Sequence, residues 1–196
     1  MIQTIYPVPS SSFVHEGAYV IGKVLIGEYV SIWPGVVIRG DLNEIKIGNY
    51  VNIQDNAVLH VDGSSPIEIG AYSLIGHMAV LHGCKIGKAC MIGIRSIVMD
   101  DAEIGDGAMI TADCIIRGKM KIPPFSLVTN VNGELKIYPD KAKTLYTILG
   151  SLEYVELAKR HKEKNFEAFT EEEMQKLKRE AKEVFRKLFP ERVDKE

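Results

Sequence analysis

An aliphatic side chain recurs at about every sixth position along most of this chain, with two short insertions, and polar or turn-forming residues lie between. The nineteen members of the series are Val14, Val20, Ile26, Ile32, Ile38, Ile47, Ile53, Leu59, Ile69, Ile75, Leu81, Ile86, Ile92, Val98, Ile104, Ile110, Ile116, Ile122 and Val128. A small or β-branched residue follows most of them four positions later, as at Ala18, Val36 and Ala79. A six-residue period is typical of a parallel β-helix, in which each hexad forms one side of a coil. We therefore expect a mainly β fold over residues 1–138, a left-handed parallel β-helix with three hexads in each coil.

Glycine often follows the aliphatic residue directly, as at Gly27, Gly70 and Gly93. A residue without a Cβ reaches backbone conformations that are closed to other residues, which suits a tight corner. We expect these glycines at the corners between the sides of each coil.

The hexad pattern stops near Pro139, and residues 139–196 follow a helical pattern instead. The first part of this segment has apolar residues on two sides, so we expect a helix that lies between two surfaces. Thr170 and Glu173 have the spacing of a capping box, and a single apolar stripe runs from there to Pro190. The stripe is a candidate partner-recognition face, but docking on the same chain is the simpler interpretation. We expect this segment to pack on the β-helix.

Composition limits the possible roles of the chain. Its 196 residues are 46% hydrophobic, which is enough for one core and a small appendage. The net charge of −2 gives no basic surface of the kind that nucleic acid would require. No apolar segment approaches the ~20 residues that span a bilayer, and the first residues lack a leader pattern, so we expect a soluble, cytoplasmic protein without membrane contacts. The three cysteines form no paired framework, and Cys90 and Cys114 fill small inward positions as expected buried, reduced thiols.

His60, His82 and Arg39 each directly follow an inward aliphatic residue. Inward and outward side chains alternate along a strand, so these three should point outward. The hexad count, with insertions near residues 41–46 and 62–66, places them one above another on successive coils. Adjacent strands lie about 4.8 Å apart, so His60 and His82 can bind one metal ion together.

His77 belongs to a different side of its coil, five residues before His82. Five extended residues reach roughly 16 Å, whereas a His–Zn bond is about 2.0–2.1 Å, so His77 should not reach the same ion within one chain. The same count stacks Asp55 one coil below His77. The chain would then carry two half-sites on different edges, and a cyclic trimer would join them into complete sites by heterologous contacts.

A single outward histidine on a repeat protein is most often a solvated surface residue, and we expect His15 and His161 to be structural. Two histidines in register favour a metal site instead. Three neutral imidazoles with an open fourth position are typical of catalytic zinc, because structural zinc sites fill all four positions and favour cysteine.

The order of several short motifs resembles the gamma-class carbonic anhydrase family over residues 9–131. The motifs are Arg39-Gly40-Asp41, Asn52-Ile53-Gln54-Asp55-Asn56, Leu59-His60 and Ile75-Gly76-His77-Met78-Ala79-Val80-Leu81-His82-Gly83-Cys84. In that family three histidines bind zinc or ferrous iron across a trimer interface, two from one subunit and one from the next. The resemblance implies hydration of CO2 to bicarbonate by a homotrimer, a lyase reaction, with His60, His77 and His82 as ligands of Zn2+, and Fe2+ or Co2+ as possible substitutes.

The resemblance also implies roles for other residues. By position, the chain matches the family's interface ion pair and the residues around its catalytic water: Arg39 and Asp41 for the first, and Asn52, Gln54 and Asp55 for the second. Gln54 would orient the attacking hydroxide, and Asp55 would support a histidine or accept a proton. Tyr154 resembles a tyrosine that many relatives place near the metal from the C-terminal helix.

Two features depart from the family's archetype. Its extended acidic loop, with a glutamate implicated in proton transfer, is replaced by a short turn at residues 62–66, and Leu42 stands where it has another glutamate. Asp62 is then the candidate proton shuttle. Relatives with short loops carry labels such as ferripyochelin-binding, carnitine-operon or phenylacetate-degradation protein. Three alternatives stay open: a metal-dependent thioester hydrolase, a hexapeptide acyltransferase, which typically uses a single catalytic histidine, and a non-catalytic metal-binding or assembly protein.

Overall fold

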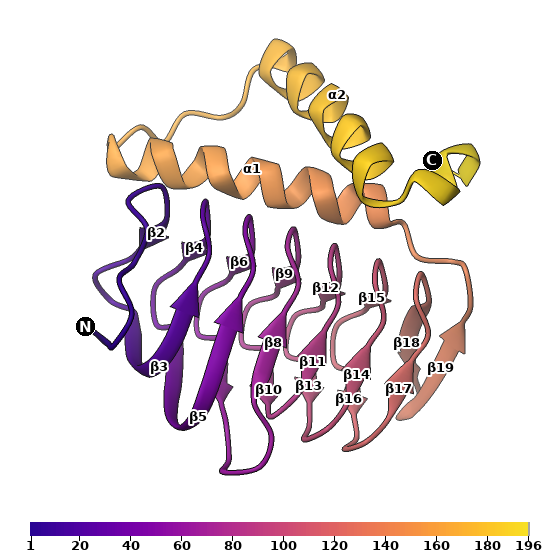
Figure 1. Ribbon diagram of the computed structural model, residues 1–196. Coiled ribbons are helices and arrows are strands. Elements are labelled where there is room, and N and C mark those ends of the chain that lie inside the picture. The colour runs from indigo at the N-terminus through magenta and orange to yellow at the C-terminus, as the bar shows by residue number, and fades with distance from the viewer. Residues whose placement is uncertain (196) are drawn as a thin grey trace.

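The hexads fold into short parallel strands that wind into a three-sided solenoid, seen from the side in Figure 1. The computed structural model describes residues 1–195. Strand β1 (Ile2–Thr4) pairs with the first full coil, and β19 (Glu134–Tyr138) pairs antiparallel with the last strand of the solenoid. The solenoid is the left-handed parallel β-helix that the repeat predicts.

Each of the three faces is a stack of strands from successive coils. The helix face consists of β2 (Phe13–Val14), β4 (Ser31–Ile32), β6 (Asn52–Ile53), β9 (Leu74–Ile75), β12 (Met91–Ile92), β15 (Met109–Ile110) and β18 (Leu127–Val131). The histidine face consists of the first halves of β3 (Tyr19–Ile26) and β5 (Val37–Ile47), then β7 (Val58–His60), β10 (Val80–His82), β13 (Ile97–Val98) and β16 (Ile115–Ile116). The charged face consists of the second halves of β3 and β5, then β8 (Ile67–Ile69), β11 (Lys85–Ile86), β14 (Glu103–Ile104) and β17 (Lys121–Ile122).

The repeating aliphatic residues form the core of the solenoid. Eighteen of the nineteen are at most 3% exposed, and the remaining one, Val14, is partly buried against the same core. Full burial of one such side chain contributes about 1.5–3 kcal/mol. The core therefore fixes which side chain of each strand points outward.

The glycines that follow the aliphatic residues lie at the corners as expected, but close packing between coils, and not a positive φ, requires glycine there. The left-handed backbone conformation lies two residues later, for example at Tyr50 and Tyr72, with φ of 60° and 62°. Gly70 has no positive φ, but a Cβ built on it would lie 2.4 Å from the backbone nitrogen of Lys88 on the next coil. These positions need glycine because adjacent coils approach closely, and the turn conformation is adopted elsewhere.

Two helices follow the solenoid, as the sequence predicts. α1 (Thr144–Lys162) contacts β4, β6 and β9 of the helix face on one side and α2 (Glu171–Leu188) on the other, so its two apolar sides are both used (Figure 1). The capping box at the start of α2 is present, and the helix ends before a short 3-10 helix, η1 (Pro190–Lys195). The apolar stripe of α2 docks on its own chain through residues such as Ala181 and Phe185. None of the helices described is long and apolar enough to cross a membrane.

The cysteines are free and buried, as expected for Cys90 and Cys114 and also found for Cys84. Burial raises the pKa of the Cys84 and Cys90 thiols to about 12. These side chains are therefore protonated core residues at neutral pH.

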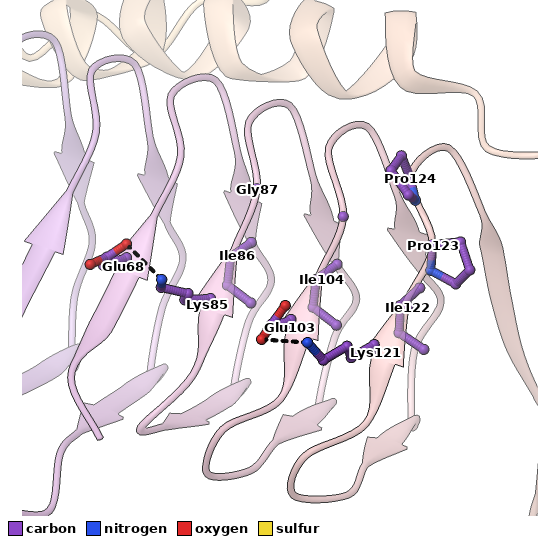
Figure 2. A pocket seen from close by; sticks show the side chains of 11 residues that line it. Glu68, Lys85, Ile86, Gly87, Glu103, Ile104, Lys121, Ile122, Pro123 and Pro124 are labelled. Carbon is purple, nitrogen blue, oxygen red and sulfur yellow. Dashed lines mark ion pairs between the residues drawn. The ribbon is translucent and has the colours of Figure 1, made fainter. Parts of the chain in front are cut away.

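Outward residues on the charged face pair with each other along the solenoid axis. Lys85 lies 3.7 Å from Glu68, and Lys121 lies 3.1 Å from Glu103, at a shallow pocket that Pro123 also lines (Figure 2). Exposed ion pairs of this kind contribute little stability. They make this face hydrophilic.

Candidate metal centre

The structure stacks Arg39, His60 and His82 on successive coils of the histidine face. Arg39 on β5 lies opposite His60 on β7, which lies opposite His82 on β10. All three point outward, because the residue before each of them is fully buried. The register obtained by counting hexads is confirmed.

A carboxylate lies against one ring nitrogen of each stacked histidine. Asp41 Oδ1 is 3.2 Å from His60 Nε2, and Asp100 Oδ1 is 2.5 Å from His82 Nδ1. An ionised carboxylate only accepts hydrogen bonds, so it favours the tautomer with a proton on the facing nitrogen. This network assigns the lone pairs to His60 Nδ1 and His82 Nε2.

These two lone-pair nitrogens face each other at the distance that a shared metal ion requires. His60 Nδ1 lies 3.2 Å from His82 Nε2. Two nitrogens at about 2.0–2.1 Å from one tetrahedral zinc ion would be about 3.3 Å apart. Facing lone pairs repel, and a cation between them converts that repulsion into attraction. The residues therefore fit a divalent metal ion.

His77 and Asp55 lie at the border between the helix face and the histidine face. His77 follows β9, and its Nδ1 is 2.9 Å from Asp55 Oδ2 on the preceding coil, so the expected stacking is confirmed. This contact leaves Nε2 of His77 for a ligand. Among the side chains that the structure describes in one chain, residues 1–193, no three His, Cys, Asp or Glu form a group that could hold a metal ion.

Of the two amides expected near the catalytic water, only Gln54 contacts a candidate ligand. Its Oε1 accepts a hydrogen bond from the His77 backbone N–H at 3.2 Å, which leaves its NH2 group as a donor. Asn52 is 1% exposed and donates to Ser31 Oγ at 2.8 Å. Its Oδ1 has no hydrogen-bond partner among the described residues.

Arg39 and Asp41 form their ion pair within a single chain. Their side chains are 45% and 36% exposed. Partial desolvation opposes the shift, but hydrogen bonds from Arg39, a backbone N–H and His60 hold the pKa of Asp41 below its ordinary value. Asp41 is therefore ionised at neutral pH and bridges Arg39 to His60.

Tyr154 reaches this region from α1. Its ring packs against Trp33, with centroids 5.7 Å apart, and Trp33 lies beside Gln54 on the adjacent coil. Burial, assisted by the negative charges of Asp55 and Glu153, raises the pKa of Tyr154. Its hydroxyl is thus protonated at neutral pH and is available as a hydrogen-bond donor.

The carboxylate of Asp62, the candidate proton shuttle, is used to close the turn at residues 62–66. It accepts hydrogen bonds from the backbone N–H groups of Ser65 and Ser64, at 2.7 and 2.8 Å, which lower its pKa. A carboxylate held in this way is a weak proton acceptor at neutral pH.

The two remaining histidines contact each other at the C-terminal end of α1. The rings of His15 and His161 lie 5.5 Å apart, and both also contact Phe13. They belong to an aromatic cluster that packs α1 against the first coil, in agreement with a structural role.

Two residues of the site, Asp100 and Trp33, were not found from the sequence. Asp100 stands two positions after an inward valine, so the hexad count places it above Gly83 and not above His82. The sequence offered one signal for Asp100: Gly83 has no side chain, so it leaves space beside the candidate ligand His82. Trp33 could have been found by stacking it on Gln54.

Comparisons with known proteins agree with the resemblance. Residues 83–118 match the family described as "Bacterial transferase hexapeptide (six repeats)". The chain is 38% identical over 145 residues to a "Probable carbonic anhydrase" of Methanocaldococcus jannaschii, covering 73% of this chain and 90% of that protein. It is 31% identical over 173 residues to "Gamma carbonic anhydrase 2, mitochondrial" of Arabidopsis thaliana, covering 85% of this chain and 62% of that protein.

A solved structure of similar fold is a putative acetyltransferase of Bacillus cereus, with a TM-score of 0.74 and 33% identity over 82% of this chain and 91% of that one. The hexapeptide fold is thus shared by proteins named for different reactions. The relative from Methanocaldococcus is matched over nearly its whole length and carries the more specific name. By its hexapeptide repeats and these relatives, the chain belongs to the gamma-class carbonic anhydrase-like family of hexapeptide-repeat proteins.

Proposed function

We propose that this protein hydrates CO2 to bicarbonate as a metal-dependent homotrimer. Each site would combine His60 and His82 of one subunit with His77 of the neighbouring subunit. The observation that carries the proposal is the 3.2 Å separation of His60 Nδ1 and His82 Nε2, with carboxylates against the opposite nitrogens. Zinc is the first candidate, with ferrous iron and cobalt as alternatives.

The surface of the histidine face supports assembly through that face. The face has two outward columns, and the one that precedes the inward aliphatic residues is apolar from the first coil to the last: Tyr19, Val37, Val58, Val80, Ile97 and Ile115. Tyr19 and Ile115 are 47% and 52% exposed in the single chain. Burial of such a column against the adjacent border of a second copy, which carries His77, gives a heterologous contact that closes into a ring.

In the completed site, a divalent metal held by the three histidines would make hydroxide available at neutral pH, because it would lower the pKa of a bound water far below that of bulk water, to about 7, a magnitude known from carbonic anhydrase itself. The chain's own residues orient the reactants. Gln54 donates through its NH2 group, because its Oε1 is occupied by His77 N–H. Tyr154, protonated at neutral pH, donates its hydroxyl to an oxygen of CO2 or bicarbonate. Asp55 keeps His77 in the tautomer that leaves Nε2 for the metal.

The rate of this reaction should depend on the buffer. Hydroxide regeneration requires a proton to leave the site, and Asp62 is occupied by its turn. Without an acidic loop, an imidazole-type buffer should carry the proton, so turnover should rise with buffer concentration. The same protein in a weak, non-shuttling buffer should turn over slowly.

The test is CO2 hydration by anaerobically purified protein loaded separately with zinc, ferrous iron and cobalt. Hydration with at least one metal, lost in His82→Ala, supports the proposal. As a control, His15→Ala removes a histidine outside the site and should retain full activity. Full metal occupancy without hydration, in any buffer, would refute it.

A second candidate is hydrolysis of a thioester by the same centre. The aromatic pair of Trp33 and Tyr154, beside Gln54, provides an apolar wall that could bind an acyl group larger than CO2. Purified protein assayed with a panel of acyl-CoA substrates separates the two activities. A metal-loaded protein inactive on both CO2 and thioesters would leave a metal-binding or assembly role.

A further inference from the structure

Asp100 reaches His82 from the next coil. Its Oδ1 lies 2.5 Å from His82 Nδ1, which is the shortest of the three contacts between a candidate ligand and a carboxylate. We propose that Asp100 is a positioning residue of the metal centre, which holds the proton on His82 Nδ1 and directs Nε2 toward the ion. This inference rests on the proposed metal site.

The surrounding backbone is shaped to admit this carboxylate. Gly83 has φ of 51°, and a Cβ at this position would lie 2.6 Å from Asp100 Oδ1. The Asp101 N–H donates to Gly83 O at 2.8 Å, and the Lys119 N–H donates to Asp100 O at 2.9 Å. The backbone of Asp100 is thus fixed on both sides, and its carboxylate occupies the space that a side chain at residue 83 would take.

The contact matters because the two tautomers of a neutral imidazole present different nitrogens as ligands. Without Asp100, His82 could carry its proton on Nε2, the nitrogen that faces His60 Nδ1 at 3.2 Å. Metal binding would then require the proton to move and the ring to be reoriented. Removal of a hydrogen-bond partner of this kind typically weakens metal binding 10- to 100-fold.

The variant that tests this role is Asp100→Ala, and Asp101→Asn is its matched control. Asp101 is the next residue, so the control removes the same charge from the same corner. Its carboxylate accepts from Ser65 Oγ at 2.7 Å, away from His82, and its φ of 59° is tolerated by asparagine. Thermal unfolding of both variants is measured first, to establish that each of them folds.

Two measurements decide the outcome. Zinc affinity of the assembled protein is measured by competition with a chelator, and the tautomer of His82 is read from 15N spectra of metal-free, histidine-labelled protein. We expect Asp100→Ala to weaken zinc binding about 10- to 100-fold and to lose the Nδ1–H tautomer, while Asp101→Asn matches the unsubstituted protein in both.

Zinc affinity of Asp100→Ala within about twofold of the control, or a retained Nδ1–H tautomer at His82, would overturn the proposal. Unsubstituted protein that binds none of zinc, ferrous iron and cobalt would refute the proposed function instead. In that case the spectra of the metal-free protein still decide whether Asp100 holds the proton on His82 Nδ1.

Discussion

Tyr154 shows how the environment of one residue limits its chemistry. Burial and the charges of Asp55 and Glu153 raise its pKa above the ordinary value of 10.0, so the hydroxyl stays protonated throughout the neutral range. Tyr154→Phe keeps the ring against Trp33 and removes only the donor. We expect a lower kcat for CO2 hydration with an unchanged pH profile below about pH 9. Loss of a basic limb in this range would show that Tyr154 titrates during turnover.

Gly70 illustrates the tight spacing of the coils at single-residue scale. A Cβ there would lie 2.4 Å from Lys88 N and 2.5 Å from the carbonyl carbon of Gly87, both backbone atoms that cannot move aside. Gly70→Ala should lower the free energy of unfolding by about 1–3 kcal/mol, as overpacking does in cores. Gly63→Ala is the control, because nothing lies within 4 Å of the added Cβ. Equal urea midpoints for the two variants would contradict this explanation.

The sequence predicts single residues well where the hexad register decides their direction. His60 and His82 stack because both follow an inward residue, and this can be counted. The hexad count does not predict the contact between Asp100 and His82. Asp100 stacks on Gly83, and its side chain reaches diagonally to His82 through the space that the glycine leaves. How far a side chain reaches at a corner depends on the shape of the backbone there, and the six-residue period does not specify that shape.

At the scale of elements, the helices follow local signals while the long strands do not. The sequence predicted both the two apolar sides of α1 and the capping box of α2. The insertion at residues 41–46 lies inside β5, one strand of eleven residues, and it interrupts the pairing with β3 as expected. Gly40 pairs with Gly22 and Ile45 with Val24, so β5 has three extra residues at this point before Ile45 re-enters the core.

The capping box gives a prediction confined to α2. Thr170 Oγ1 accepts from Glu173 N–H at 3.2 Å, and Thr170 N–H donates to Glu173 Oε2 at 2.7 Å. Thr170→Ala should destabilise the protein by about 1 kcal/mol and speed amide exchange in the first turn of α2. Thr170→Ser, which keeps the hydroxyl, should change neither. Metal content should stay the same in both variants, because α2 packs on α1, whereas His60 and His82 lie on β7 and β10, outside the helix face.

At the scale of the whole molecule, the contrast between two faces predicts how copies assemble. The apolar column of the histidine face should be covered in a trimer of three times 21.8 kDa. Ile115, at 52% exposure, can be changed to Glu without loss of core packing. Ile115→Glu should shift sedimentation toward the monomer, because a charge buried at an interface without a partner is costly. Lys121→Glu on the charged face, 72% exposed, should remain trimeric. A trimer that survives Ile115→Glu would place the interface elsewhere.

Subunit mixing tests whether the metal site is shared between chains. His77→Ala keeps the His60 and His82 pair, and the double variant His60→Ala, His82→Ala keeps only His77, so neither alone should bind metal at more than a small fraction of full occupancy. In a mixed cyclic trimer, one of the three interfaces joins an intact pair to an intact His77. Unfolding and refolding the two variants together should therefore restore about one metal ion per mixed trimer, measured by elemental analysis after separation from free metal. Refolding each variant separately is the control. A mixture that regains no metal, or a His77→Ala protein that is nearly fully occupied by itself, would show that the three histidines do not act together across an interface.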